Sequence, residues 1–318
     1  MKIFIKKNIL GIIIGIVIGI TSVVIAESIN SSEVLYDNSD SVSNDTTVKG
    51  ALDSLFDIVD HSSTGFSLLA HNPVGLSTEL IDGYYRYQGV QDANNNVDNY
   101  ICFGTNDKNT CINNMYKFMY RIIGINTNGQ IKLIKKDALN PMYQWNTSNG
   151  VEWPNSSLFA GLNGDYFLNN VQYFPSSSWR DKIIETNWHY YTSSNINISS
   201  IGSGELNADS VTAKIGIMYI HDYADSISPI GYSSSSWIHF LNNDTNFPNS
   251  SFECTISRKN GTQPWMIQSN GSLTISNASD GTLTATHPVR PVFLINSGER
   301  IASGSGTLSD PYILEDVS

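Results

Sequence analysis

Four residues of a polar segment could bind a sugar or a peptide. They are Trp237, Asn242, Asp244 and Trp265, in a loop-like region between residues 231 and 265. An exposed indole can stack on a sugar ring while neighbouring polar groups bond its hydroxyls. We therefore predict a ligand-binding surface here, although large aromatic residues also cover the core of loop-rich domains.

Histidine and carboxylate residues are the candidates for acid–base chemistry. No two of the six histidines are spaced as metal ligands on one element, and none accompanies a Gly-x-Ser-x-Gly turn. His221, followed by Asp222 and close to Asp225, is the best general-base candidate. Glycan hydrolysis needs two carboxylates across a cleft, and the candidates are Glu185, Glu205, Asp209 and Glu253. We expect no catalytic residue, no metal ligand and no cofactor, and so no enzyme.

The three cysteines indicate an oxidising compartment. Cys102 and Cys111 enclose a polar stretch between two apolar segments, which predicts a disulfide across a hairpin-like loop. Cys254 alternates with polar residues as in a strand, where a lone cysteine behaves as a small buried apolar residue. The three lack the spacing of a zinc site.

The N-terminus predicts export. Lys2, Lys6 and Lys7 precede an apolar run up to Ala26, and we expect residues 1–26 to be a signal peptide or an uncleaved membrane anchor. The whole chain has 18 basic and 29 acidic residues and a net charge of −11. This balance, without a basic patch, excludes nucleic-acid binding, and we expect membrane contact only through the N-terminal segment. The predicted location is extracellular or at the cell surface.

Residues 27–46 are rich in Ser, Asn and Asp and predict an extended linker. Residues 47–60 then place Val48, Leu52, Leu55, Phe56 and Val59 on one face of a short amphipathic helix. So short a helix must pack against something. It either packs on its own domain or forms a homo-oligomer through residues 47–59. Residues 61–78 read as a second linker, and the main domain spans 79–318.

The main domain reads as α+β with a mostly antiparallel sheet. Its strongest local signal is a hairpin, with strands over 118–125 and 130–135 joined at Asn128-Gly129. Two helices are expected, over 156–169 and 178–188, followed by a polar loop over 193–209 and a strand over 213–220. Arg290 lies in an otherwise apolar strand, so its charge requires a buried carboxylate partner.

The order of several segments resembles a largely uncharacterised family of exported proteins from low-GC Gram-positive bacteria. The matching segments are Val97–Gly104, Tyr120–Gly124, Gln130–Lys135, Tyr143–Asn146, Ala213–Tyr223, Val289–Ser297 and Gly304–Tyr312. More remotely, the Arg-Pro-Val segment at Arg290 is similar to the last core strand of the C-type-lectin-like fold, which formylglycine-generating enzymes share. This resemblance implies a C-type-lectin-like α+β domain with two helices and long loops.

The activities of that fold are not implied. Calcium-dependent lectins use Glu-Pro-Asn or Gln-Pro-Asp and Trp-Asn-Asp triplets, whereas this chain has Gln263-Pro264-Trp265 and Asn242-Asn243-Asp244. Formylglycine generation needs a C-terminal cysteine pair, of which only Cys254 is present. We therefore expect a non-enzymatic surface or secreted protein that binds an extracellular carbohydrate or protein ligand. The alternatives are a structural fibre subunit and an exported glycan hydrolase.

Overall fold

The computed structural model describes residues 65, 68, 75–89, 97–197, 200–226, 252–268, 273–274 and 283–315. All of them belong to one compact unit, Val59–Ser318. The predicted export segment, the linker after it and the amphipathic helix over 47–60 lie outside the described residues and stay predictions. Among the described residues, no helix is long and apolar enough to cross a membrane.

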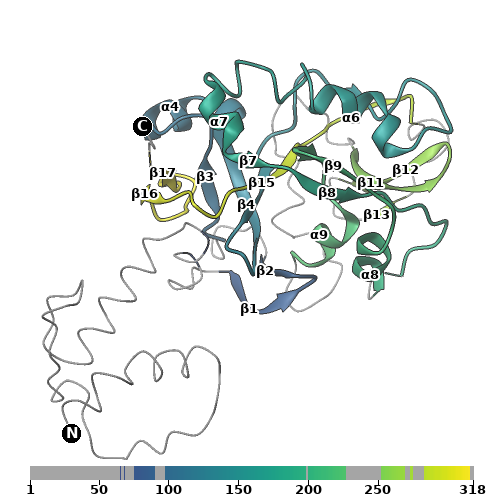
Figure 1. The fold of residues 1–318 in the computed structure, drawn as a ribbon, viewed down its shortest axis with the longest axis horizontal. Helices are drawn as coiled ribbons and strands as arrows, with labels where there is room; N and C mark the ends of the chain where they lie inside the picture. Colours follow the sequence, from purple (N-terminus) through teal and green to yellow (C-terminus); the bar gives the residue numbers. More distant parts are fainter. Residues whose placement is uncertain are drawn as a thin grey trace, which may run out of the picture. The chain divides into compact units, whose positions relative to one another are not determined.

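An eight-stranded sheet forms the centre of this unit (Figure 1). Its strand order is β1-β2-β4-β5-β15-β10, with β3 added beside β4 and β7 beside β15, and every pair is antiparallel. The strands are β1 (Leu76–Ile81), β2 (Tyr84–Tyr87), β3 (Tyr100–Cys102), β4 (Met119–Asn126), β5 (Ile131–Lys135), β7 (Ile183–Ile184), β10 (Ile215–Gly216) and β15 (Val292–Ile295). The predicted α+β class with a mostly antiparallel sheet is confirmed.

The predicted hairpin is the β4–β5 pair. Ile125 faces Ile131 across the ladder, and Gly129 has the left-handed backbone (φ 74°) that a glycine adopts without steric cost. The whole of β5 and all of β4 except Asn126 are buried. Burial on both faces explains why apolar residues here do not simply alternate with polar ones.

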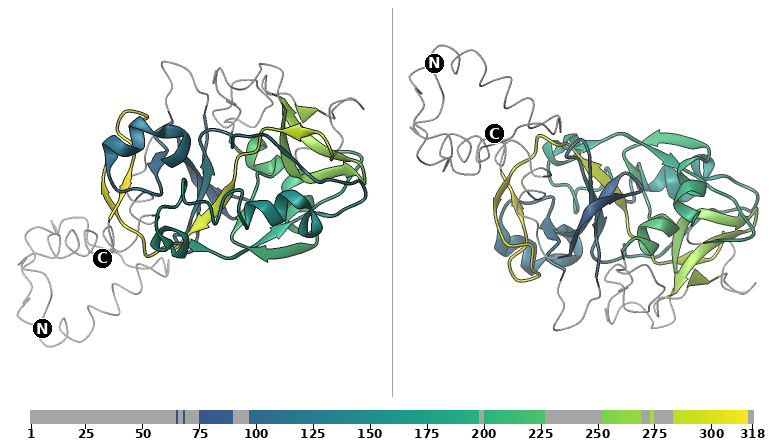
Figure 2. Two further views of the ribbon diagram at one scale, coloured as in Figure 1. Left: turned by 90° about the horizontal axis from the view of Figure 1, so that it is seen from above. Right: turned by 90° about the horizontal axis from the view of Figure 1, so that it is seen from below.

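Smaller sheets surround the central one. A three-stranded sheet consists of β11 (Phe252–Asn260), β12 (Gln263–Gln268) and β13 (Leu273–Thr274). Three two-stranded sheets pair β6 (Tyr143–Gln144) with β14 (Thr286–His287), β8 (Thr186–His189) with β9 (Ser210–Ala213), and β16 (Ile301–Ser303) with β17 (Ile313–Leu314). The views of Figure 2 place β11 and β12 (light green) at the opposite end of the unit from β16, β17 and α4 (Lys108–Asn113).

Six short α-helices occur among the described residues, where the sequence predicted two longer ones. Besides α4, they are α5 (Met115–Phe118), α6 (Ser157–Leu162), α7 (Ser177–Asp181), α8 (Ile201–Leu206) and α9 (Ile220–Ala224), and a 3-10 turn η1 spans Trp153–Asn155.

The first predicted helix starts correctly, because the Ser156 hydroxyl caps it by accepting from the Phe159 N–H. It ends seven residues early, at Leu162 instead of Asn169. The Asn163 amide there bonds both the N–H and the C=O of Ile215, at 3.0 and 2.9 Å. These bonds to β10 turn the chain away from the helix axis.

The second predicted helix, over 178–188, is wrong beyond Asp181. Ile183 and Ile184 pair with β15, and residues 186–189 pair with β9. Strand partners distant in sequence override the local helical pattern here. Similarly, the loop predicted over 193–209 contains α8, and the strand predicted over 213–220 divides into the end of β9, β10 and the start of α9.

The predicted disulfide between Cys102 and Cys111 is present. The segment it closes differs from the expected hairpin-like loop, because Cys111 lies in α4. Asp107 caps that helix by accepting from the Thr110 N–H. The bond thus ties the end of β3 to a helix, and Cys254, as expected, is a free buried thiol.

Candidate functional site

Three of the four predicted binding residues, Trp237, Asn242 and Asp244, lie outside the described residues. The fourth, Trp265 on β12, is 5% exposed and packs with Ile201 and Ile220. Its indole N–H donates to the Ser193 carbonyl at 3.0 Å. Ligand stacking on Trp265 stays a prediction, and it would require this buried ring to become accessible.

Two of the four nominated carboxylates are held in the interior. Glu253 accepts two hydrogen bonds from the Arg290 guanidinium, at 2.8 and 2.7 Å, and both side chains are buried. Arg290 therefore has the buried carboxylate partner that the sequence predicted. Glu185 and Asp209 lie on the surface.

Glu205 on α8 organises the start of α9. Its carboxylate accepts from the backbone N–H groups of Ile220 and His221 at 3.1 and 3.0 Å, and from the Ser257 hydroxyl. It also lies 2.8 Å from Nδ1 of His221. The carboxylate is completely buried, so these donors replace the water that it gives up.

Asp222 is the centre of a buried ionic network. Lys132 Nζ lies 2.7 and 2.6 Å from its two oxygens, and Arg86 Nη1 lies 2.6 Å from one of them. Burial alone would raise the pKa of Asp222, but Lys132 and Arg86 outweigh it and hold that pKa well below its usual range. Two cations from β2 and β5 thereby attach α9 to the central sheet.

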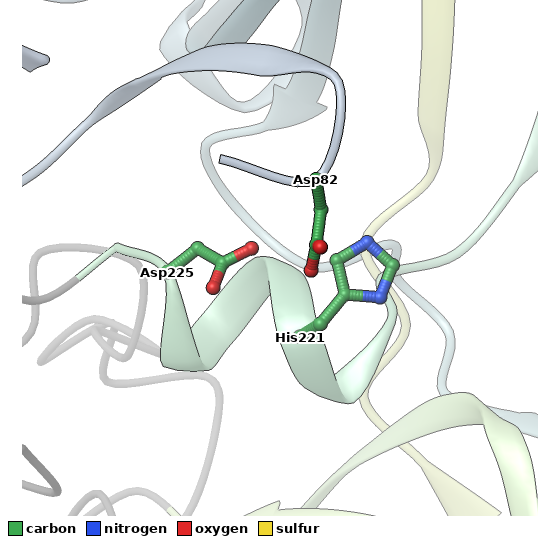
Figure 3. A group of neighbouring side chains, drawn as sticks. All are labelled: Asp82, His221 and Asp225. Atoms are coloured by element: carbon green, nitrogen blue, oxygen red, sulfur yellow. The ribbon is translucent and has the colours of Figure 1, made fainter. Parts of the chain in front are cut away.

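His221, the predicted general base, lies beside this network with Asp82 and Asp225. The three side chains face one another, with the Asp82 carboxylate between Asp225 and the imidazole (Figure 3). Burial raises the pKa of Asp225 to about 6, although the neighbouring Arg86 guanidinium lowers it. The sequence indicated His221 and Asp225, whereas Asp82 gave no signal because it is 139 positions before His221 in the chain.

A cavity of about 480 Å³ opens beside β3 and the start of β4. Its apolar lining consists of Val97, Tyr100, Ile112, Met115 and Leu308. Its polar lining consists of Asp98, Arg121, Thr307 and Ser309. This volume lies within the range of about 300–1,000 Å³ usual for small-molecule sites, and the mixed lining is also typical of them.

Arg121 gives this cavity a fixed polar wall. Its Nε donates to the Asn99 amide oxygen at 2.8 Å, and its guanidinium lies 4.3 Å from the centre of the Tyr100 ring. Burial lowers the pKa of Arg121 to about 10, so it stays charged at neutral pH. The sequence did not indicate this cavity, because its walls come from three separate segments, 97–100, 112–121 and 307–309.

Comparison with protein-family models, curated proteins and solved structures finds no match to this chain.

Proposed function

We propose that this protein is an exported, non-enzymatic ligand-binding protein of the cell surface or the extracellular space. The observation that carries the proposal is the 480 Å³ cavity between β3, α4, α5 and the 307–309 loop. An apolar wall with a few fixed polar groups binds the apolar face of a ligand and orients its polar groups. The ligand class we propose is an extracellular carbohydrate or a short segment of a protein.

Preorganisation supports this site. The Cys102–Cys111 disulfide joins the strand and the helix that border the cavity, and Asn99 and Tyr100 hold Arg121 in place. Walls that are ordered before binding reduce the entropy that binding costs. The α+β class with an antiparallel sheet is consistent with a C-type-lectin-like domain, which we propose as the finer description of the fold.

The test is a binding screen of the purified full-length protein against glycan and peptide libraries, with and without a chelator. The test variant is Leu308→Arg, which places a charge at a residue that lines the cavity and is 40% exposed. Leu80, which is 47% exposed and does not line it, is replaced in the control Leu80→Arg. We expect saturable binding of a ligand that persists in the presence of the chelator. The ligand should bind Leu80→Arg as it binds the wild type, and it should bind Leu308→Arg at least about tenfold more weakly.

Three outcomes would contradict the proposal. Equal binding by both variants would show that the ligand does not bind in the cavity. The absence of any ligand for folded protein would favour a structural subunit, and turnover of a glycan that one carboxylate-to-amide change abolishes would favour a hydrolase.

A further inference from the structure

Asp82, His221 and Asp225 form a cluster that shares no residue with the cavity. Asp82 lies in the turn between β1 and β2, His221 lies in α9, and Asp225 is the residue that caps the C-terminus of α9. One nitrogen or oxygen atom from each residue lies within 4.8 Å of the other two. Donor atoms bound to one ion at about 2.0–2.2 Å lie about 3–3.6 Å apart, so the three side chains would have to close by about 1 Å around an ion.

The His221 imidazole is held in one orientation by a buried contact with Glu205. It is 1% exposed, and its Nδ1 lies 2.8 Å from the Glu205 carboxylate, which can only accept, so Nδ1 carries the proton. In the neutral imidazole the lone pair is then on Nε2. No described residue is within hydrogen-bond distance of Nε2, whose nearest charged neighbour is Asp222 Oδ1 at 3.6 Å.

Figure 3 shows a ring carbon of His221 nearest to Asp82, with one ring nitrogen next to that carbon and the other turned away from both aspartates. A histidine that binds a metal through one nitrogen commonly donates the other N–H to a carboxylate, which fixes the tautomer and the ring orientation. Glu205 has that position here.

Asp225 contributes a second unused atom. Its Oδ2 is buried and receives no hydrogen bond from the described residues, and the nearest cation is Arg86 Nη2 at 3.6 Å. A buried carboxylate oxygen without a hydrogen bond costs free energy, which a bound cation would recover. Asp82 is exposed, so an ion could enter from solvent and complete its coordination with water.

The local charge balance also favours a cation. The four carboxylates of Asp82, Glu205, Asp222 and Asp225 are neighbours of two basic side chains, Arg86 and Lys132. Both cations hydrogen-bond to Asp222, which is therefore satisfied without an ion, whereas Asp225 has only the longer contact with Arg86 Nη2 at 3.6 Å. A metal-bound imidazole is neutral, so four carboxylates would then face two side-chain cations, and a divalent ion would neutralise the difference.

We propose that Asp82, His221 and Asp225 bind one divalent first-row transition-metal ion, with Glu205 orienting the histidine. The imidazole ligand selects for ions such as Zn²⁺ over Ca²⁺ and Mg²⁺, which prefer all-oxygen sites. The ion ties the β1–β2 turn to α9. This inference is independent of the proposed ligand-binding function.

The experiment is calorimetric titration of Zn²⁺ into untagged full-length protein stripped with a chelator. We expect one ion per chain, and Co²⁺ should give the visible absorption bands of a protein-bound ion. Asp82→Asn should weaken Zn²⁺ binding by about tenfold or more. Asp165→Asn changes another exposed aspartate in the same way and should bind like the wild type. The unfolding midpoint of metal-free Asp82→Asn, which should equal that of the wild type, separates loss of a ligand from loss of fold.

Three results would overturn the inference. The first is no saturable binding with a dissociation constant below about 1 mM. The second is equal Zn²⁺ affinity in Asp82→Asn and Asp165→Asn, which would assign the ion to other histidines of the chain. The third is tighter binding of Ca²⁺ than of Zn²⁺, which would exclude the transition-metal class.

Discussion

At the scale of single residues, this protein buries charged side chains and gives them specific partners. The Arg290–Glu253 pair connects β11 to the segment before β15, and Asp222 connects α9 to Arg86 on β2 and Lys132 on β5. Each ion would be very costly to bury alone, and its partner offsets that cost. Removing one member of such a pair should therefore destabilise the fold far more than removing both.

The Arg290–Glu253 pair allows a direct test of this asymmetry. Arg290→Met leaves the Glu253 carboxylate buried without its cation and should lower the free energy of unfolding by about 3–5 kcal/mol. In Arg290→Met/Glu253→Gln no uncompensated charge is left, so a substantial part of that loss should be recovered. Urea unfolding of the wild type and both variants measures the difference. Equal stability of the two variants would contradict the explanation.

Lys135 predicts a pH dependence of stability. It is fully buried, its ammonium donates to the carbonyls of Tyr116 and Lys117, and burial lowers its pKa to about 7. Between pH 7 and its ordinary pKa of about 10.4, the unfolded chain binds a proton that the folded protein does not bind. Stability should therefore rise with pH across this window, by up to about 1.4 kcal/mol per pH unit, and fall as pH drops toward 7.

Lys135→Met removes the titrating group, so the difference in unfolding free energy between wild type and variant isolates its contribution. Guanidinium unfolding at pH 7.0, 8.0 and 9.0 measures this difference at each pH. A difference that stays constant across the three values would show that Lys135 has an ordinary pKa in the folded protein.

At the scale of elements, short helices and strands are held in place by covalent and polar ties. The clearest tie is the disulfide, which joins the last residue of β3 to α4. A six-residue helix has little stability of its own, and this one also depends on its Asp107 cap.

Reduction of the disulfide should destabilise the protein. The bond closes a loop of about ten residues, which corresponds to about 2.5–3 kcal/mol in the chain-entropy model. The denaturation midpoint should fall in reductant, and Cys102→Ser/Cys111→Ser should have the lowered midpoint with no further response to reductant. Cys254→Ser, which leaves the disulfide intact, should retain the full response to reductant. A midpoint that reductant leaves unchanged would contradict this prediction.

At the scale of the whole molecule, the described unit has two separate candidate sites. The cavity lies beside the disulfide, whereas the Asp82–His221–Asp225 cluster lies at α9, and no described residue belongs to both. We therefore expect ligand binding and metal binding to be separable by mutation.

Self-association through residues 47–59 is a further prediction at this scale, based on the sequence alone. Leu55→Asp/Phe56→Asp places charges on the apolar face of the predicted helix, so an oligomer held by that face should dissociate. Light scattering coupled to size-exclusion chromatography measures the mass, and Ser54→Asp, outside that face, is the control. A wild type of monomeric mass would support packing of the helix on its own domain.

The sequence by itself determined the features that depend on neighbouring residues or on one residue's chemistry. The Asn128-Gly129 hairpin follows from local turn geometry and flanking apolar residues. The Cys102–Cys111 pair follows from close spacing, and the need of Arg290 for a carboxylate follows from the cost of burying a charge.

Only the tertiary structure decided which distant residues meet. Part of a segment that the sequence predicted as a helix forms β7 and β8, because strand partners from other parts of the chain pair with it. It selected Glu253 among the acids for Arg290, and it brought Asp82 to His221 and the 307–309 loop to Tyr100. Such encounters depend on the packing of the whole chain, which no local pattern of residues encodes.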